Sequence, residues 1–144
     1  ALSEVNIEDI NMDNRTIIIT EKGNVTRPCK FGQKVASIMK KWLSDRKKLL
    51  DGQDVDALFI STQRRRMTPR SIDYLIRKYS VGIDKKVSPH KLRSTCGNSL
   101  YKETRDIYLV QSVLGHSNIK NTRRYAQVDD DIREEAVSYM ESLL

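Results

Sequence analysis

The sequence predicts a mainly α (α+β) domain, helical with a small antiparallel β-sheet near its N-terminal end. Three observations carry this prediction: two extended runs separated by turn residues, a long segment with helical apolar spacing, and two Ser/Thr-Pro helix starts. The 144 residues are enough for one domain with a hydrophobic core. Because the chain shows neither an internal repeat nor a low-complexity linker, we expect one compact domain.

The first elements are predicted to form a β-hairpin. Residues 16–20 are β-branched at every position, which favours a strand. Residues 21–24 supply turn chemistry, and residues 25–30 form the returning strand. Pro28 indicates that this second strand lies at a sheet edge. Lys22 is therefore expected at the hairpin tip.

A helix is predicted next, over residues 33–50. Its apolar residues recur at intervals of three and four, and Arg46 and the lysines are expected on the opposite, solvated face. Residues 51–54 carry the polar and glycine residues that end it. Residues 57–60 predict a short buried strand or extended segment, and Arg64–Arg66 follow in a polar loop.

Two further helices have the same start signal, in which a hydroxyl residue caps the helix and proline takes its first position. Thr68-Pro69 begins one of them and Ser88-Pro89 begins the other. In the first, a single apolar stripe is expected to contain Ile72, Leu75, Ile76 and Tyr79.

The remaining residues predict two more helices. A short one covers residues 106–114 and ends at Gly115. The last covers residues 130–144, with aspartates at its start that the helix dipole favours. Its apolar face either closes the domain's own core or packs elsewhere, and the sequence leaves both possibilities open.

Composition narrows the class of protein. The net charge of +7 favours a polyanionic partner, with nucleic acid first, although charge alone leaves open a merely solvated basic surface. No apolar run reaches membrane-spanning length and nothing at the start looks like a signal peptide, so we expect a cytoplasmic protein. Cys29 and Cys96 form no C-x-x-C pattern and are expected to be reduced thiols.

The two histidines of the chain stand beside other chemically active residues. His90 and Arg93 are three apart and share one helix face, and His116 and Tyr125 follow in a second block. Cations, proton carriers and a phenol together suit attack on a phosphodiester without a metal, because the protein supplies the positive charge. The alternatives are structural histidines, a surface ion pair at Arg93 and a tyrosine that only packs.

These blocks resemble those of the tyrosine recombinases, also called phage integrases. His90-Lys-Leu-Arg93 resembles their H-x-L-R box, and Leu114-Gly-His116-Ser…Thr…Tyr125 looks like their L-G-H-S…T…Y block. Residues 20–24 are similar to their G-K-G-N hairpin. The likeness covers nearly the whole chain and implies that residues 1–144 are a tyrosine recombinase catalytic domain with this fold.

The resemblance implies a role for each of five residues. Tyr125 would attack a DNA phosphate, giving a 3′-phosphotyrosyl link and a free 5′-hydroxyl; since a phenol has a pKa near about 10, it needs nearby cations. Arg93 would bind the non-bridging oxygens with its planar fork. His90 would accept or relay the nucleophile's proton, His116 would donate a hydrogen bond to a phosphate oxygen, and Lys22 would protonate the leaving oxygen. No metal and no cofactor is implied.

The sequence departs from the family pattern in two places. The family's first arginine lies upstream of Ala1 or is replaced at Ala1 itself, so we expect a fragment that lacks the start of the domain and an N-terminal DNA-binding domain. Because a second phosphate-clamping arginine is worth on the order of a thousandfold in rate, we expect the fragment alone to be weak or inactive. Ser94, Cys96 and Gly97 replace the family's usual His, Phe and Ala and are expected to affect packing.

Some of the basic residues are expected to contact DNA. Arg64, Arg65 and Arg66 precede a helix start, and Arg123 and Arg124 flank Tyr125. Such phosphate contacts would position a duplex and make binding depend on salt without selecting a sequence. The resemblance also implies a homo-oligomer on DNA, a tetrameric synapse, with the last helix docked within its own protomer or on a neighbour.

The sequence-based prediction of function is site-specific DNA recombination, the integration or excision of a phage or other mobile element. Three alternatives remain at this point: a type IB topoisomerase-like strand transferase, a catalytically impaired DNA-binding module, and a helical transcription regulator. The last would leave both histidines unexplained.

Overall fold

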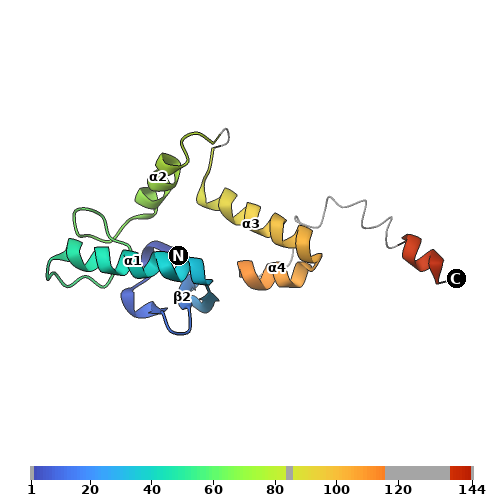
Figure 1. Cartoon of the computed structure of the whole chain (residues 1–144), viewed down its shortest axis with the longest axis horizontal. Coiled ribbons are helices and arrows are strands. Elements are labelled where there is room, and N and C mark those ends of the chain that lie inside the picture. Colours follow the sequence, from blue (N-terminus) through green and yellow to red (C-terminus); the bar gives the residue numbers. More distant parts are fainter. Residues whose placement is uncertain (1, 84–85, 116–136, 144) are drawn as a thin grey trace. The chain divides into compact units, whose positions relative to one another are not determined.

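A computed structural model describes residues 2–83, 86–115 and 137–143 (Figure 1). The chain divides into two compact units, residues 1–86 and 87–144. The sequence predicted one compact domain. Helices predominate, and a three-stranded antiparallel sheet lies near the N-terminal end. The predicted mainly helical α+β class is therefore confirmed.

Unit 1, residues 1–86, begins with two 3-10 turns, η1 (Leu2–Glu4) and η2 (Ile7–Asp9). Residues 2–4 form a single 3-10 turn and no α-helix. The chain leaves η1 at Val5, whose carbonyl accepts a hydrogen bond from the Leu58 N–H at 2.9 Å. The Ile7 N–H likewise donates to the Asp56 carbonyl at 2.7 Å, so a distant segment pairs with residues 5–7.

The sheet follows in the order β1-β2-β3, with β1 at Ile10–Asn11, β2 at Thr16–Glu21 and β3 at Val25–Lys30. The predicted hairpin is confirmed, and its register runs from Thr16 opposite Lys30 to Glu21 opposite Val25. Gly23 takes a φ of +89°, which glycine adopts without a steric penalty. β1 was not predicted, because two residues are too short for an alternating pattern to show.

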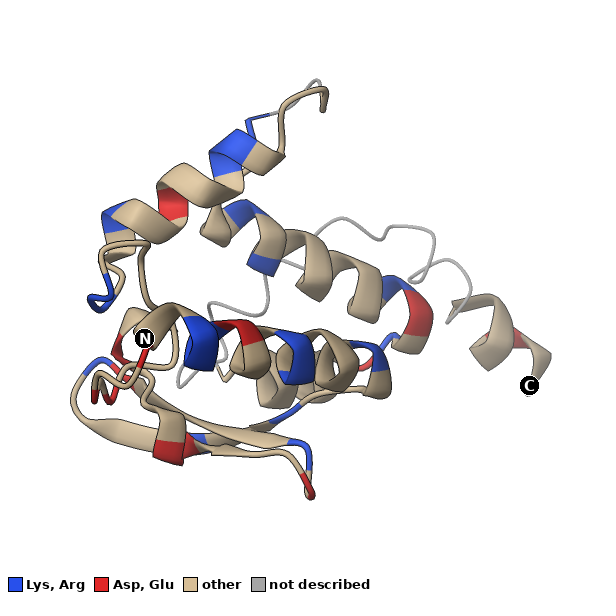
Figure 2. Ribbon diagram, turned by 60° about the vertical axis from the view of Figure 1, so that its left-hand side comes forward, with Lys and Arg blue, Asp and Glu red and all other residues tan. Residues whose placement is uncertain are grey.

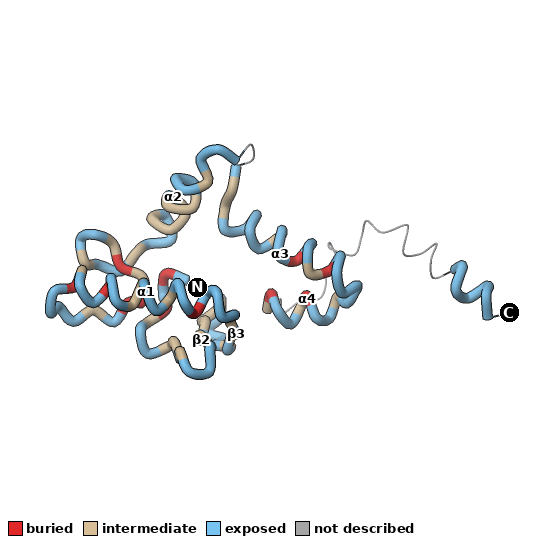
Figure 3. Tube along the Cα trace, in the orientation of Figure 1, coloured by how far each residue is buried: buried red, intermediate tan, exposed pale blue. Residues whose placement is uncertain are grey.

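The helix α1 (Gln33–Leu50) is confirmed at the predicted bounds and provides the main packing face of unit 1. Leu50, Ala57 and Ile60 are buried together, and Trp42 packs against them. Figure 3 colours the chain by burial, with the buried positions in red. The Trp42 indole N–H donates to the Leu58 carbonyl at 3.0 Å. Residues 57–60 are thus the buried extended segment that the sequence predicts.

Arg46 corrects the prediction that it lies on the solvated face of α1. The residue is 8% exposed. Its Nε donates to the Ala57 carbonyl at 3.0 Å, its Nη2 donates to the same oxygen at 2.8 Å, and Nη2 also bonds the Val55 carbonyl. A buried carbonyl must find a donor, and the Val55 and Ala57 carbonyls find theirs in this guanidinium, whereas the Asp56 carbonyl accepts from the Ile7 N–H.

Replacing Arg46 by alanine is expected to lower the free energy of unfolding of unit 1 by about 3 kcal/mol, because buried carbonyls lose their donor and a cavity remains. Trp42 is the single tryptophan of this chain and contacts the same segment, so its fluorescence during urea unfolding reports the loss. The neighbouring exposed residue offers a control: Lys47→Ala should change stability by less than about 0.5 kcal/mol. Equal stability of the two variants would contradict this role of Arg46.

A narrow ribbon joins this segment to the next helix. Ile60 and Arg66 form an antiparallel bridge, and the Met67 N–H donates to the Phe59 carbonyl at 3.0 Å. The ribbon turns at residues 61–65, where Arg64 adopts a φ of +61°.

The helix α2 (Pro69–Tyr79) begins as predicted, because the Thr68 hydroxyl accepts from the Ser71 N–H at 3.1 Å. Tyr79 was expected in the apolar stripe of this helix but is 78% exposed. It is the last residue of α2, where the chain turns away, so helical spacing overestimated its burial.

Unit 2, residues 87–144, contains α3 (Pro89–Thr104), which starts where predicted, and α4 (Ile107–Leu114), which is close to its predicted bounds. Tyr101 of α3 packs against Val110 and Leu114 of α4. The Asp106 carboxylate caps α4 by accepting from two backbone N–H groups, and Gly115 ends it with a φ of +68°.

Residues 137–142 are helical, which confirms the predicted last helix over that part. The predicted start of this helix at residue 130 lies outside the described residues. In the parts of the chain that the structure describes, no helix combines the length and apolar character needed to cross a bilayer.

Candidate active site and nucleic-acid interface

His90 and Arg93 lie in the first turns of α3, and the sequence sets their position locally. The Ser88 hydroxyl accepts from the Lys91 N–H at 3.3 Å, and Pro89 occupies the first helical position. The helix therefore begins one residue before His90, and its periodicity places His90 and Arg93 on the same face about one turn apart. Both residues are exposed, as groups that bind an external ligand must be.

Arg93 joins this turn to the end of α4. Its Nη2 donates to the Leu114 carbonyl at 2.6 Å, across a separation of 21 residues. The last carbonyls of a helix lack intrahelical partners and carry the negative end of its dipole, so a guanidinium is a favourable partner there. The contact brings Arg93 of the H-x-L-R box to Leu114, the first residue of the L-G-H-S block. A shared site formed by the two boxes needs them to lie this close.

The remaining residues of that block are not described. His116, Tyr125, Arg123 and Arg124 lie outside the described residues, and their expected roles stay predictions. The described part ends at Gly115, whose N–H donates to the Gln111 carbonyl at 2.8 Å. The left-handed conformation of Gly115 turns the chain directly beside the Arg93 contact.

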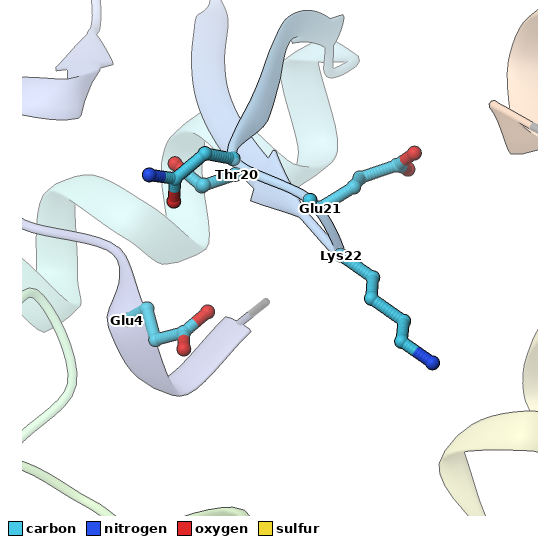
Figure 4. A pocket seen from close by; sticks show the side chains of 6 residues that line it. Glu4, Thr20, Glu21 and Lys22 are labelled. Atoms are coloured by element: carbon cyan, nitrogen blue, oxygen red, sulfur yellow. The ribbon is translucent and has the colours of Figure 1, made fainter.

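Lys22 belongs to unit 1 and lies in the turn between β2 and β3, as predicted. The turn and the η1 segment line one shallow depression, to which Glu4, Thr20 and Lys22 contribute. Figure 4 shows the Lys22 side chain extending away from Glu4 and Thr20. An exposed ammonium at a hairpin tip is accessible to a polyanion approaching that edge.

The three arginines of the ribbon differ in their surroundings. Arg65 is exposed, and Arg64 lies 3.9 Å from the Asp51 carboxylate in an exposed ion pair. Arg66 is exposed, but its guanidinium is engaged by the protein: it donates to the carbonyls of Ser3 and Val5 and to the Asn6 amide oxygen. Of the three, Arg65 and Arg64 are therefore the better placed to bind phosphates. The Arg66 contacts could not be predicted from local sequence, because the residues it contacts lie 60 or more positions away along the chain.

Basic residues occur on several elements of both units (Figure 2). Within the described ranges, no group of three His, Cys, Asp or Glu side chains is arranged to hold a metal ion. Cys29 and Cys96 are both free thiols, as expected.

The fold is that of a tyrosine recombinase catalytic domain. A crystal structure of XerA recombinase matches 96% of this chain and 51% of its own, with a TM-score of 0.79 and 27% sequence identity. A structure of XerH recombinase bound to its difH substrate before cleavage matches 96% of this chain and 41% of its own, with a TM-score of 0.77 and 27% identity.

Sequence comparison gives the family. The model of the phage integrase family matches residues 2–131, and the chain belongs to that family. Tyrosine recombinase XerC of Alcanivorax borkumensis is 32% identical over 130 residues, which are 89% of this chain and 42% of that protein. XerC of Caldanaerobacter subterraneus is 34% identical over 142 residues, 95% of this chain and 39% of that protein. The chain thus spans about two fifths of the length of these relatives.

Proposed function

We propose that the protein of which this chain is part carries out site-specific DNA recombination, integrating or excising a mobile element. The single observation that carries the proposal is the 2.6 Å hydrogen bond from Arg93 to the Leu114 carbonyl. It holds the Arg93 guanidinium of the H-x-L-R box next to the start of the L-G-H-S block, and side chains of both boxes would form the phosphate site. A packing tyrosine and a solvent-facing ion pair at Arg93, the alternatives from sequence, do not explain that juxtaposition.

The chemistry assigned to the site is phosphoryl transfer through a covalent intermediate. The Tyr125 oxygen attacks the scissile phosphorus, the bond to the 5′-oxygen breaks, and a 3′-phosphotyrosyl link and a 5′-hydroxyl result. Arg93 and His116 stabilise the charge on the non-bridging oxygens, His90 takes the phenol's proton, and Lys22 gives a proton to the leaving oxygen. The link conserves the phosphodiester energy, so a second 5′-hydroxyl reverses the step.

The substrate of this proposal is duplex DNA carrying inverted binding sites. The XerH structure is a complex with DNA, which supports the same partner here. Residues 1–144 would be part of the catalytic domain, an N-terminal DNA-binding domain would complete a clamp, and four protomers would form the synapse. The protein would work on the nucleoid in the cytoplasm.

A nicked duplex tests the function. The full-length protein first selects its binding site from a random DNA pool, and that site is then rebuilt with a nick beside the scissile phosphate. After cleavage the short 5′-hydroxyl strand diffuses away, so a covalent adduct accumulates and migrates slowly on a denaturing gel. A protein that shifts this DNA on a native gel but gives no adduct would be the DNA-binding module, and the proposal would be wrong. Relaxation of supercoiled plasmid of any sequence would indicate a topoisomerase.

Replacing Arg65 by alanine tests the ribbon as a phosphate contact. Each phosphate neutralised by a cation adds about 0.9 to the magnitude of the slope of log K against log salt on duplex DNA. We expect Arg65→Ala to reduce that slope by about this amount and to weaken specific and random DNA equally. Arg27→Ala, on β3, serves as a comparison in the same binding titrations. If the salt slope of Arg65→Ala is unchanged, Arg65 at the ribbon tip does not contact a DNA phosphate.

A further inference from the structure

Arg66 forms a set of contacts that phosphate binding does not explain. Its Nη1 donates to the Ser3 carbonyl at 3.0 Å and to the Val5 carbonyl at 3.3 Å, and its Nη2 donates to the Asn6 Oδ1. Ser3 is 8% exposed and Val5 is 3% exposed, so the carbonyls belong to an inward-facing stretch of chain. A planar guanidinium presents several donors in a fixed fork, which suits it to clamp neighbouring acceptors at once.

The clamp acts on the η1 turn in particular. Pairing with residues 56–58 holds the chain from Val5 onward through two backbone hydrogen bonds, at 2.9 Å and 2.7 Å. Within the turn, the Val5 N–H reaches the Leu2 carbonyl only at 3.4 Å, a long hydrogen bond. The bond from Arg66 to the Ser3 carbonyl therefore fixes the part of the segment that backbone pairing holds least firmly.

The η1 turn is also one wall of the depression at the hairpin tip. Glu4 lies between the carbonyls that Arg66 clamps, and it lines the depression together with residues 20–24, which include Lys22 (Figure 4). Movement of η1 would change the shape and charge of the surface against which the Lys22 turn lies. A displacement of about 1 Å in a catalytic group can cost on the order of a hundredfold in rate.

We infer that Arg66 is a positioning residue: it holds η1 against the ribbon and so fixes the wall beside which Lys22 delivers its proton. This inference rests on the proposed function, in which Lys22 protonates the leaving 5′-oxygen. In this role Arg66 acts through η1 and not by binding the phosphate itself. Its substitution should impair proton delivery to the leaving group and spare DNA binding.

A substrate with sulfur in place of the bridging 5′-oxygen separates these effects. An alkoxide leaving group needs a proton, since the pKa of an aliphatic hydroxyl lies far above neutral pH, whereas a thiol has a pKa of about 8.5 and leaves as the thiolate unaided. The measured quantity is the ratio of single-turnover cleavage rates, sulfur substrate over oxygen substrate. With the full-length protein, Lys22→Ala should raise this ratio by about a hundredfold, the scale of a lost general acid.

For Arg66→Ala we expect the ratio to rise about tenfold, with DNA affinity within about twofold of the unmodified protein and an unchanged salt slope. Arg66→Lys retains one charge without the fork and should show a smaller rise. Asn6→Ala removes the side-chain oxygen that accepts from Arg66 Nη2. This variant tests the same clamp if Arg66→Ala folds poorly. Thr62→Ala, at an exposed position of the same ribbon with no assigned role in binding, should leave the ratio unchanged.

Each outcome decides a separate claim. If Lys22→Ala raises the ratio but Arg66→Ala and Asn6→Ala lower both rates equally, Arg66 does not position the Lys22 wall and the inference is wrong. A fall in the salt slope of Arg66→Ala at an unchanged ratio would make Arg66 a phosphate contact instead. If Lys22→Ala itself leaves the ratio unchanged, the assignment of Lys22 in the proposed function fails, and the inference fails with it.

Discussion

Tyr125→Phe is expected to abolish the covalent adduct between the full-length protein and its nicked duplex. The substitution removes only the hydroxyl oxygen, so no nucleophile remains at that position, while the ring still fills the same space. The adduct should fall below detection, a loss of at least about a thousandfold. The native gel shift of the same DNA should be unchanged, because the phosphate-binding cations remain.

The other tyrosines supply the control for this experiment. Tyr108→Phe, on the exposed surface of α4, removes a hydroxyl from the same unit and should leave the adduct intact. Peptide mapping of the adduct should find the nucleotide on Tyr125. An adduct that persists in Tyr125→Phe, or maps to another tyrosine, would overturn the assignment of the nucleophile.

Arg93→Lys is expected to lower the cleavage rate of the full-length protein by about a hundredfold to a thousandfold, the cost of removing one oriented donor from a transition state. The lysine keeps the charge but offers a single ammonium in place of a fork that binds two oxygens. The guanidinium also has a structural contact, because its Nη2 donates to the Leu114 carbonyl at 2.6 Å. The same substitution should therefore lower the stability of unit 2 by about 1 kcal/mol, the net value of one hydrogen bond.

The two effects of Arg93→Lys are measured separately. Single-turnover cleavage on the nicked duplex gives the rate, and hydrogen exchange at the amides of α4 gives the local stability. Lys102 lies at the other end of α3 from Arg93. Lys102→Ala should therefore change neither the cleavage rate nor the exchange rates of the α4 amides by more than about twofold. If Arg93→Lys cleaves at the unmodified rate, Arg93 does not bind the scissile phosphate and the proposed active site is wrong.

The helices and strands that carry the site residues could be predicted from neighbouring residues in the sequence. The Thr68 and Ser88 caps and the helix end at Gly115 each depend on residues within a few positions of the helix end, and all three form as predicted. Asp106, predicted as the first residue of its helix, is the cap of α4. The hairpin likewise follows from adjacent β-branched and turn residues. The sequence therefore placed Lys22 in a turn and placed His90 and Arg93 on one helix face.

Arginine environments could not be predicted in the same way. Helical spacing placed Arg46 with the lysines on a solvated face, yet its guanidinium bonds the carbonyls of Val55 and Ala57. A charged residue in a basic stretch has the same local pattern whether it faces water or a buried carbonyl. The difference depends on which distant backbone groups lack partners, and that is known only when the chain is folded.

The sequence by itself determined the class of fold, the ends of the helices and the two boxes that identify the family, because each depends on neighbouring residues and on residue type. Only the tertiary structure decided which cations bind the protein's own backbone and that Arg93 meets the end of α4. These contacts join residues 9 to 63 positions apart. They form because folding leaves buried carbonyls without a donor, and a guanidinium within reach satisfies them.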